Sequence, residues 1–206
     1  MTDAPLSRWE RGGEKNTGYG RRFAELVEAG ADIDGEARLA DALVPRQARI
    51  LDAGSGMGRV AAYLQGRGHR VVAAEPDLRL VAQSRRTYPD VTVLPHDILG
   101  LTPEVLTAAG GPTEFDLVVC VGNVITFVAE GTEVAVLRRF RELLAPDGRA
   151  LVGFHLEDGP HTARSVTPDQ FAGEVEAAGL RVDHRFGGYD LRPADDLYAV
   201  WILRAA

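Results

Sequence analysis

The sequence lacks the features that mark disulfide-bonded, cysteine-ligated or membrane-spanning proteins. Cys120 is the only cysteine in 206 residues, which excludes a disulfide within the chain and a metal cluster held by cysteines. No run of about 18 apolar residues occurs, so no membrane-spanning helix is predicted. The first residues, MTDAPLSRWERGGEK, have no apolar signal-peptide core. We therefore expect a cytoplasmic protein with no membrane partner.

An excess of positive charge is also lacking. The sequence has 23 Lys and Arg residues and 30 Asp and Glu residues, which gives a formal net charge of −7. A general nucleic-acid binder usually presents a basic face, so the charge balance favours no nucleic-acid partner. The length suits one compact unit with a substantial buried core.

From residue 47 onward, short apolar segments alternate with segments of helical periodicity. Strands are predicted at 48–53, 69–75, 91–95, 115–121, 149–154, 180–187 and 196–203, and helices at 59–66, 76–88, 102–110, 132–144 and 167–179. The segment APDG (145–148) is typical of a turn. This alternation predicts an α/β fold: a doubly wound, mostly parallel sheet with helices on both faces.

Residues 1–46 lie outside this alternation. Two helices are predicted there, at 19–30 and at 34–43, the second capped by Asp34. We expect them to pack over the mouth of the site. The chain is therefore divided into an N-terminal helical lid segment, 1–46, and a cofactor-binding domain, 47–206.

The stretch ILDAGSGMGRV places Gly54, Gly56 and Gly58 at alternate positions after Asp52. In open parallel sheets, ligands bind beyond the carboxyl ends of the strands, and glycine lets a ligand lie against bare backbone. The glycine pattern has three interpretations: a tight turn, a dinucleotide site, or a site for a cationic nucleoside. A dinucleotide site needs a small residue where Arg59 stands. Asp52 would repel a pyrophosphate but accept a hydrogen bond from an ammonium group, which favours the cationic nucleoside.

This stretch resembles motif I of the class I S-adenosylmethionine-dependent methyltransferases of small-molecule type. The resemblance extends over roughly 47–203, through VVAAEPD (71–77), LPHDI (94–98), FDLVVCVGNVITFV (115–128) and LLAPDGRALVGF (143–154). It implies a seven-stranded sheet in which only the last strand is antiparallel. It also implies S-adenosylmethionine as the cofactor and S-adenosylhomocysteine as the product.

The resemblance further implies a set of residues around the cofactor. Glu75 would take both ribose hydroxyls, because a carboxylate can accept two hydrogen bonds, and Asp97 would accept from the adenine amino group. The others are Asp52, Gly54, Ser55, Gly56 and Gly58 at the methionine part, Pro76 after Glu75, His96 and Ile98 beside the adenine, and Val121, Gly122 and Asn123 beside the sulfonium. As alternatives, Glu75 could be a solvated acid at a strand end, Asp97 a turn residue and Asn123 the cap of a turn.

In the N-terminal segment, Trp9, Tyr19 and Arg22 resemble the lid contacts of small-molecule members, which touch the cofactor carboxylate or the acceptor. The alternative for Tyr19 is that it forms, with Phe23 four residues on, the core face of a helix.

His155 directly follows the fifth predicted strand and is the candidate catalytic base. Methyl transfer is an in-line displacement, and a base is needed only when the acceptor arrives protonated. Trp9, Tyr19, Asn123 and His155 are the predicted substrate contacts. The stretch HLEDGPH (155–161) has two histidines and two acids, but not at a specific ligand spacing, so no metal is predicted.

The acceptor is predicted to be a small molecule with an O, N or S nucleophile. The acidic-Pro-Pro-aromatic motif of relatives that methylate nucleobase amino groups is absent, since the corresponding stretch reads VGNVIT. Few residues remain outside the predicted core fold for recognising a macromolecule. The alternatives are a protein or nucleic-acid methyltransferase, and a noncatalytic protein that binds a nucleoside or NAD.

Overall fold

The computed structural model describes residues 5–16 and 18–206. Its seven strands form one sheet in the order β3-β2-β1-β4-β5-β7-β6. Only β7 runs antiparallel to its neighbours, β5 and β6, and every other pair is parallel. The strands are β1 (Arg49–Ala53), β2 (Arg70–Ala74), β3 (Val93–Leu94), β4 (Phe115–Cys120), β5 (Leu144–His155), β6 (Leu180–Phe186) and β7 (Tyr198–Ala205). The predicted seven-stranded sheet with an antiparallel last strand is confirmed.

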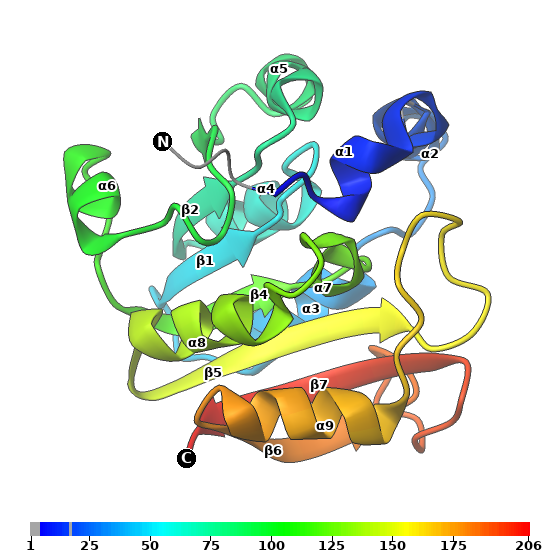
Figure 1. Ribbon diagram of the computed structural model, residues 1–206. Coiled ribbons are helices and arrows are strands. Elements are labelled where there is room, and N and C mark those ends of the chain that lie inside the picture. Colours follow the sequence, from blue (N-terminus) through cyan, green and yellow to red (C-terminus); the bar gives the residue numbers. More distant parts are fainter. Residues whose placement is uncertain (1–4, 17) are drawn as a thin grey trace.

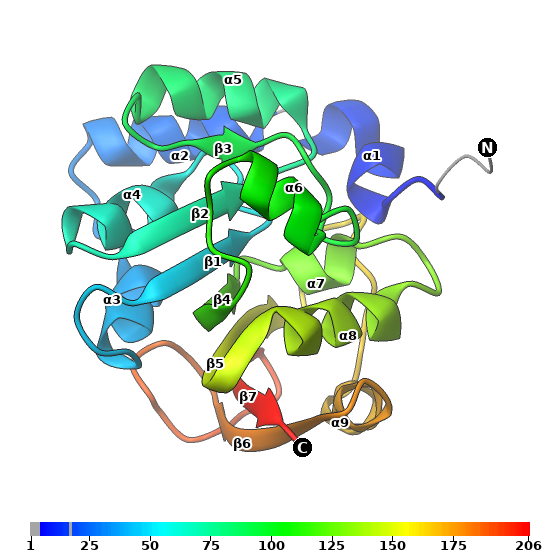
Figure 2. The ribbon, with the colours of Figure 1, turned by 90° about the vertical axis from the view of Figure 1, so that its left-hand side faces the viewer.

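Helices cover both faces of this sheet, as predicted. Helices α3, α4 and α5 lie on one face of the sheet, and α6, α8 and α9 lie on the other (Figures 1 and 2). Buried side chains of these helices pack against the strands. Among the described residues, no helix combines the length and the apolar character needed to cross a bilayer. The helices are α1 (Arg8–Gly12), the 3-10 helix η1 (Gly13–Asn16), α2 (Tyr19–Glu28), α3 (Gly35–Ala42), α4 (Arg59–Gly66), α5 (Leu78–Thr87), α6 (Pro103–Ala108), α7 (Val124–Phe127), α8 (Glu133–Leu143) and α9 (Pro168–Ala177).

The chemistry of individual residues sets where several helices begin and end. The side chains of Asp77, Thr102 and Thr167 accept backbone N–H groups in the first turns of α5, α6 and α9, which stabilises those turns. Gly179 follows α9 at φ +74°, a conformation that favours glycine. The predicted cap of α3 is wrong: Asp34 occupies the position before the helix, but its side chain makes no capping hydrogen bond.

Three parts of the chain differ from the sequence prediction. The expected turn at 145–148 is wrong, because this segment belongs to β5. Leu144 pairs with Phe115 and Arg149 pairs with Leu117, so the extra residues form a bulge between two paired positions. The third strand is reduced to Val93–Leu94 at the sheet edge, and α1, η1 and α7 were not predicted.

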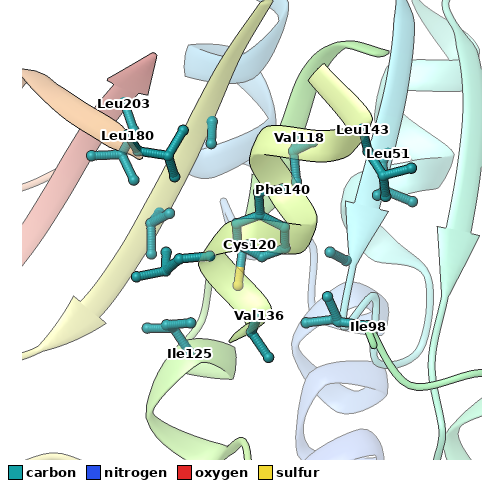
Figure 3. Close-up of a cluster of buried hydrophobic side chains, with 14 of the residues drawn as sticks. Leu51, Ile98, Val118, Cys120, Ile125, Val136, Phe140, Leu143, Leu180 and Leu203 are labelled. Carbon is teal, nitrogen blue, oxygen red and sulfur yellow. The ribbon is translucent and has the colours of Figure 1, made fainter. Parts of the chain in front are cut away.

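The largest buried cluster lies between the sheet and α6, α8 and α9. Leu51 of β1, Val118 and Cys120 of β4, and Phe140 of α8 meet there (Figure 3). Cys120 is 0% exposed, and burial raises the pKa of its thiol far above the ordinary value. Its thiolate is therefore not formed near neutral pH, and Cys120 is a small core residue, as its sequence context predicts.

Gly58 provides a test of how the chain enters α4. Its φ is +85°, and a Cβ added there would lie 2.4 Å from the hydroxyl oxygen of Ser84. We expect Gly58→Ala to lower the free energy of unfolding by about 1–2 kcal/mol or more, because a non-glycine residue is strained in this conformation. Gly66→Ala is the control: its Cβ would meet nothing within 4 Å, and stability should stay the same or rise by up to about 1 kcal/mol. Urea unfolding measures both, and a Gly58→Ala protein as stable as wild type would contradict this reading.

Candidate functional site

The carboxyl ends of the parallel strands open onto one cavity of ≈1330 Å³. They face the side of the molecule that carries α1, α7 and the loop after β5 (Figure 1). The residues that follow successive strands therefore meet at this edge of the sheet. Those on the cavity wall include Gly54 and Gly56 after β1, Glu75 and Pro76 after β2, Asp97 and Ile98 after β3, Val121, Gly122 and Asn123 after β4, and His155 at the end of β5.

Glu75 is the buried carboxylate on this wall. It is 6% exposed, so it is not a solvated strand-end acid. Its Oε2 accepts the backbone N–H of Gly56 at 2.9 Å, and its Oε1 accepts that of Asp77 at 2.8 Å. Burial raises the pKa of Glu75 from 4.5 to about 7, although both hydrogen bonds oppose the rise. Each carboxylate oxygen still has a second lone pair for a ligand.

The three glycines of the loop have different roles. Gly54, Gly56 and Gly58 all have positive φ, at 80°, 56° and 85°. A Cβ on Gly54 would lie 2.4 Å from Val124, and one on Gly58 would lie equally close to Ser84. Packing within the protein thus already requires two of these glycines. Gly54 and Gly56 border the cavity, whereas Gly58 stands at the start of α4 and makes room for Ser84.

Asp52 and Ser55 lie beneath the loop and border a second cavity of ≈20 Å³. The Oδ2 of Asp52 accepts the backbone N–H of Ala61 in the first turn of α4 at 3.1 Å. Burial raises the pKa of Asp52 to about 7, and the charge of Arg59 opposes the rise. The Ser55 hydroxyl is buried and has no hydrogen-bond partner among the described residues. This cavity has room for one water molecule or one small polar group.

The loop after β3 brings Asp97 and Ile98 to the cavity. Asp97 is exposed, and its Oδ1 accepts the backbone N–H of Gly100 at 2.6 Å, so it does shape a turn. Its other oxygen remains available to a ligand. Ile98 is buried at 7% exposure and supplies an apolar surface. His96 lies in the same loop but is not among the described residues that line the cavity.

The N-terminal segment forms another part of the wall. The Nε1 of Trp9 donates to Oδ2 of Asp77 at 2.9 Å, and its ring packs edge-on against Phe127 at 5.3 Å between centroids. Arg22 borders the cavity, and its guanidinium makes no hydrogen bond or ion pair within the described part of the chain. Tyr19 begins α2, but its side chain lies outside the described residues, so its predicted contacts stay predictions.

Arg59 ties the glycine loop to the N-terminal segment. Its guanidinium donates to both carboxylate oxygens of Glu36, at 2.9 and 2.8 Å, and to the carbonyl oxygen of Ile33. It also lies over the ring of Phe23, 5.2 Å from the centroid. Arg59, whose size is unsuited to a dinucleotide site, therefore holds the start of α3 and Ile33 just before it next to the glycine loop.

His155 and Asn123 meet at the β4–β5 side of the cavity. The backbone N–H of His155 donates to Asn123 Oδ1 at 2.8 Å, and its ring Nδ1 lies 3.1 Å from the same oxygen. The ring packs edge-on against Tyr198, at 4.7 Å between centroids. Partial burial against the cavity wall lowers the pKa of His155, and the charge of Asp158 opposes this.

Sequence reasoning missed several residues of this wall. Ser7 and Glu10 form a capping box, S-x-x-E, and this signal could have predicted the short helix that carries Trp9. Tyr189 and Tyr198, whose hydroxyls are 2.8 Å apart, come from the segment around the β6–β7 connection. No local signal marks them, because the pairing of β7 with β5 places Tyr198 beside His155, and Tyr189 contacts Tyr198 from the preceding connection. No group of three or more His, Cys, Asp or Glu side chains within the described ranges is placed to hold a metal ion.

The sheet order, the glycine loop after β1 and the carboxylate after β2 define a doubly wound fold with a nucleoside-type site at its switch point. Residues 50–148 match the family model of a methyltransferase domain. The TehB-like S-adenosylmethionine-dependent methyltransferase of Corynebacterium glutamicum is 33% identical, with 91% of this chain and 96% of that chain covered and a TM-score of 0.79. The chain therefore belongs to the class I S-adenosylmethionine-dependent methyltransferases. It is an enzyme, and S-adenosylmethionine is its cofactor.

Two further structures share the fold at lower identity. The CcbJ methyltransferase of Streptomyces caelestis is 21% identical over 84% of this chain and 90% of that chain, with a TM-score of 0.70. The 1,6-didemethyltoxoflavin-N1-methyltransferase of Burkholderia thailandensis, solved with 1,6-didemethyltoxoflavin and S-adenosylhomocysteine, is 24% identical over 99% and 93%, with a TM-score of 0.61. No curated protein matches the chain.

The raised pKa of Glu75 predicts how stability depends on pH. A carboxylate with a higher pKa in the folded than in the unfolded state binds more protons when folded, so stability falls as pH rises from about 4.5 to about 7. The loss from this one group is on the order of 3 kcal/mol. Glu75→Gln leaves one backbone N–H unpaired, so it should be less stable at pH 5 but show a smaller loss between pH 5 and 8.

Urea unfolding across this pH range measures the slope. Glu157→Gln, at an exposed carboxylate on the same cavity, is the matched control and should keep the wild-type slope. A Glu75→Gln protein with the wild-type slope would show that Glu75 is not the titrating group.

Proposed function

We propose that the protein transfers the methyl group of S-adenosylmethionine to a small-molecule acceptor by in-line displacement. The observation that carries this proposal is a single cavity whose wall holds both Glu75 and His155. Its volume, ≈1330 Å³, exceeds the roughly 300–1,000 Å³ of a site for one drug-sized ligand. It therefore has room for the cofactor and a second small molecule together. The similar Burkholderia enzyme, with two small ligands in its structure, supports this reading.

The residues on the wall fit the cofactor. Glu75 has two oxygens, each with a spare lone pair, and the two ribose hydroxyls would donate to them. The bare backbone at Gly54 and Gly56 would take the methionine part, and the guanidinium of Arg22 would pair with its carboxylate. Ile98 would cover one face of the adenine, with Asp97 accepting from the amino group.

Orientation is the main task of these residues. When bound, S-adenosylmethionine supplies an electrophilic methyl group on a sulfonium. Holding the acceptor in line with that methyl group can contribute about 7–11 kcal/mol to lowering the barrier. His155 would accept the acceptor's proton, which matters for a hydroxyl or an N–H group and not for a thiolate.

The N-terminal segment, residues 1–46, would act as the lid of the domain formed by 47–206. Arg8 donates to Glu133 at 2.9 Å and to the carbonyl oxygen of Val128 at 2.8 Å, while the neighbouring Trp9 is bound to Asp77. α1 is thus attached both to α8 and to the turn before α5. A lid in this place excludes water from the reacting groups.

Calorimetric titration with S-adenosylmethionine tests the assignment of Glu75. Ribose hydroxyls donate to the ionised carboxylate, so binding should release a proton and the affinity should rise from pH 6 to 8. Glu75→Gln should weaken binding by about 1.5–3 kcal/mol, roughly 10- to 150-fold, and remove most of this pH dependence. Asp52→Asn shows how much of the pH dependence comes from Asp52, the other buried carboxyl group with a raised pKa. Glu157→Gln should bind S-adenosylmethionine as tightly as wild type does. Equal affinity in Glu75→Gln and wild type would refute the assignment.

His155→Gln tests the base. Methyl transfer from labelled S-adenosylmethionine is measured with a panel of small phenols, alcohols, amines and thiols. For an O–H or N–H acceptor the variant should be slower by about 10²–10⁴-fold, with cofactor affinity unchanged, and a thiol should lose little. If His155→Gln methylates an O–H or N–H acceptor as fast as wild type at every pH, His155 is not the base.

A further inference from the structure

One atom of Asn123 makes two contacts with His155. Its Oδ1 accepts the backbone N–H of His155 at 2.8 Å. A backbone N–H only donates, so the atom turned toward His155 is the amide oxygen and not the amide nitrogen. The ring Nδ1 of His155 lies 3.1 Å from this same oxygen. Because an amide oxygen only accepts, Nδ1 must carry the proton, and the lone pair of the neutral ring is on Nε2.

The backbone holds Asn123 firmly in this position. The residue is 8% exposed and has φ +75° at the start of α7. Its N–H donates to the Gly153 carbonyl at 3.1 Å, and its own carbonyl accepts the N–H and the hydroxyl of Thr126 at 2.9 and 2.7 Å. On another side, the ring of Tyr198 packs against the imidazole. The imidazole is therefore held between a fixed acceptor and an aromatic ring.

The charges around His155 favour its neutral form. Partial burial lowers its pKa, and Asp158, on the loop that follows, opposes this. Asn123, on the β4 side, carries an amide and adds no charge beside the ring. The lone pair on Nε2 is consequently free to accept a proton.

We propose that Asn123 is a positioning residue that keeps the proton of His155 on Nδ1, so that Nε2 takes the proton of a hydroxyl or N–H acceptor. This inference rests on the methyl-transfer function proposed above. As the acceptor atom bonds to the methyl carbon, the carbon–sulfur bond breaks and its electron pair stays on sulfur. Nε2 takes the acceptor's proton and later releases it to solvent. The substrate class is therefore a small molecule with an O–H or N–H group at the methylated position.

Nitrogen NMR of the full-length protein labelled with ¹⁵N-histidine reads the tautomer directly, without cofactor. The His155 signals are assigned by their loss in His155→Gln. Long-range ¹H–¹⁵N spectra at pH 7.5 should show the Nδ1–H tautomer in wild type. Asn123→Gly suits the positive φ and removes the acceptor, so His155 should move to the Nε2–H tautomer or to a mixture.

A second variant keeps the test decisive if Asn123→Gly does not fold. Asn123→Asp retains an oxygen for both hydrogen bonds and adds a negative charge, so the Nδ1–H tautomer should persist and the pKa of His155 should rise by about one unit or more. An Nε2–H tautomer in wild type, an unchanged tautomer in Asn123→Gly, or an unchanged pKa in Asn123→Asp would each overturn the role of Asn123. Cofactor titration is a separate result: absence of S-adenosylmethionine binding would overturn the methyl-transfer function and, with it, the base.

Discussion

The buried carboxylate of Glu75 is the interaction on which the rest of the site depends. Removing a carboxylate from water is costly unless its oxygens are hydrogen-bonded. Glu75 meets this requirement with the N–H groups of Gly56 and Asp77, which lie on two different loops. It thereby joins the loop after β1 to the turn after β2. The side chain of Asp77 in turn accepts a hydrogen bond from the indole N–H of Trp9. The N-terminal segment is therefore connected to Glu75 through Asp77.

This connection fixes two parts of the cavity wall relative to each other. The two loops are held at the distance that one carboxylate bridges, and each oxygen of Glu75 keeps a second lone pair for a ligand. A second fixed point lies across the cavity, where Asn123 holds His155 at the end of β5. The cofactor would bind at the first point and the reacting atom of the acceptor would lie near the second. The rigid sheet between them sets their separation, which is what an in-line displacement requires.

Much of this could be predicted from the sequence because it depends on local chemistry. Alternating strands and helices gave the sheet and its covering helices, and Thr102 and Thr167 marked the starts of α6 and α9 correctly. The segment 145–148 was mistaken for a turn, because pairing with β4 overrides its local preference. Tyr189 and Tyr198 were missed for a similar reason, since long-range pairing places them. The glycine pattern was identified, but the structure assigns Gly58 to packing against Ser84, a contact that no local pattern reveals.

A crystal structure with S-adenosylhomocysteine tests the central claim most directly. The account predicts that both ribose hydroxyls lie within about 2.5–3.0 Å of the Glu75 carboxylate oxygens, with the amino-acid part against the backbone of Gly54 and Gly56. His155 would remain uncovered beside the sulfur. A ribose bound elsewhere in the cavity, with the Glu75 oxygens contacting only Gly56 and Asp77, would contradict it.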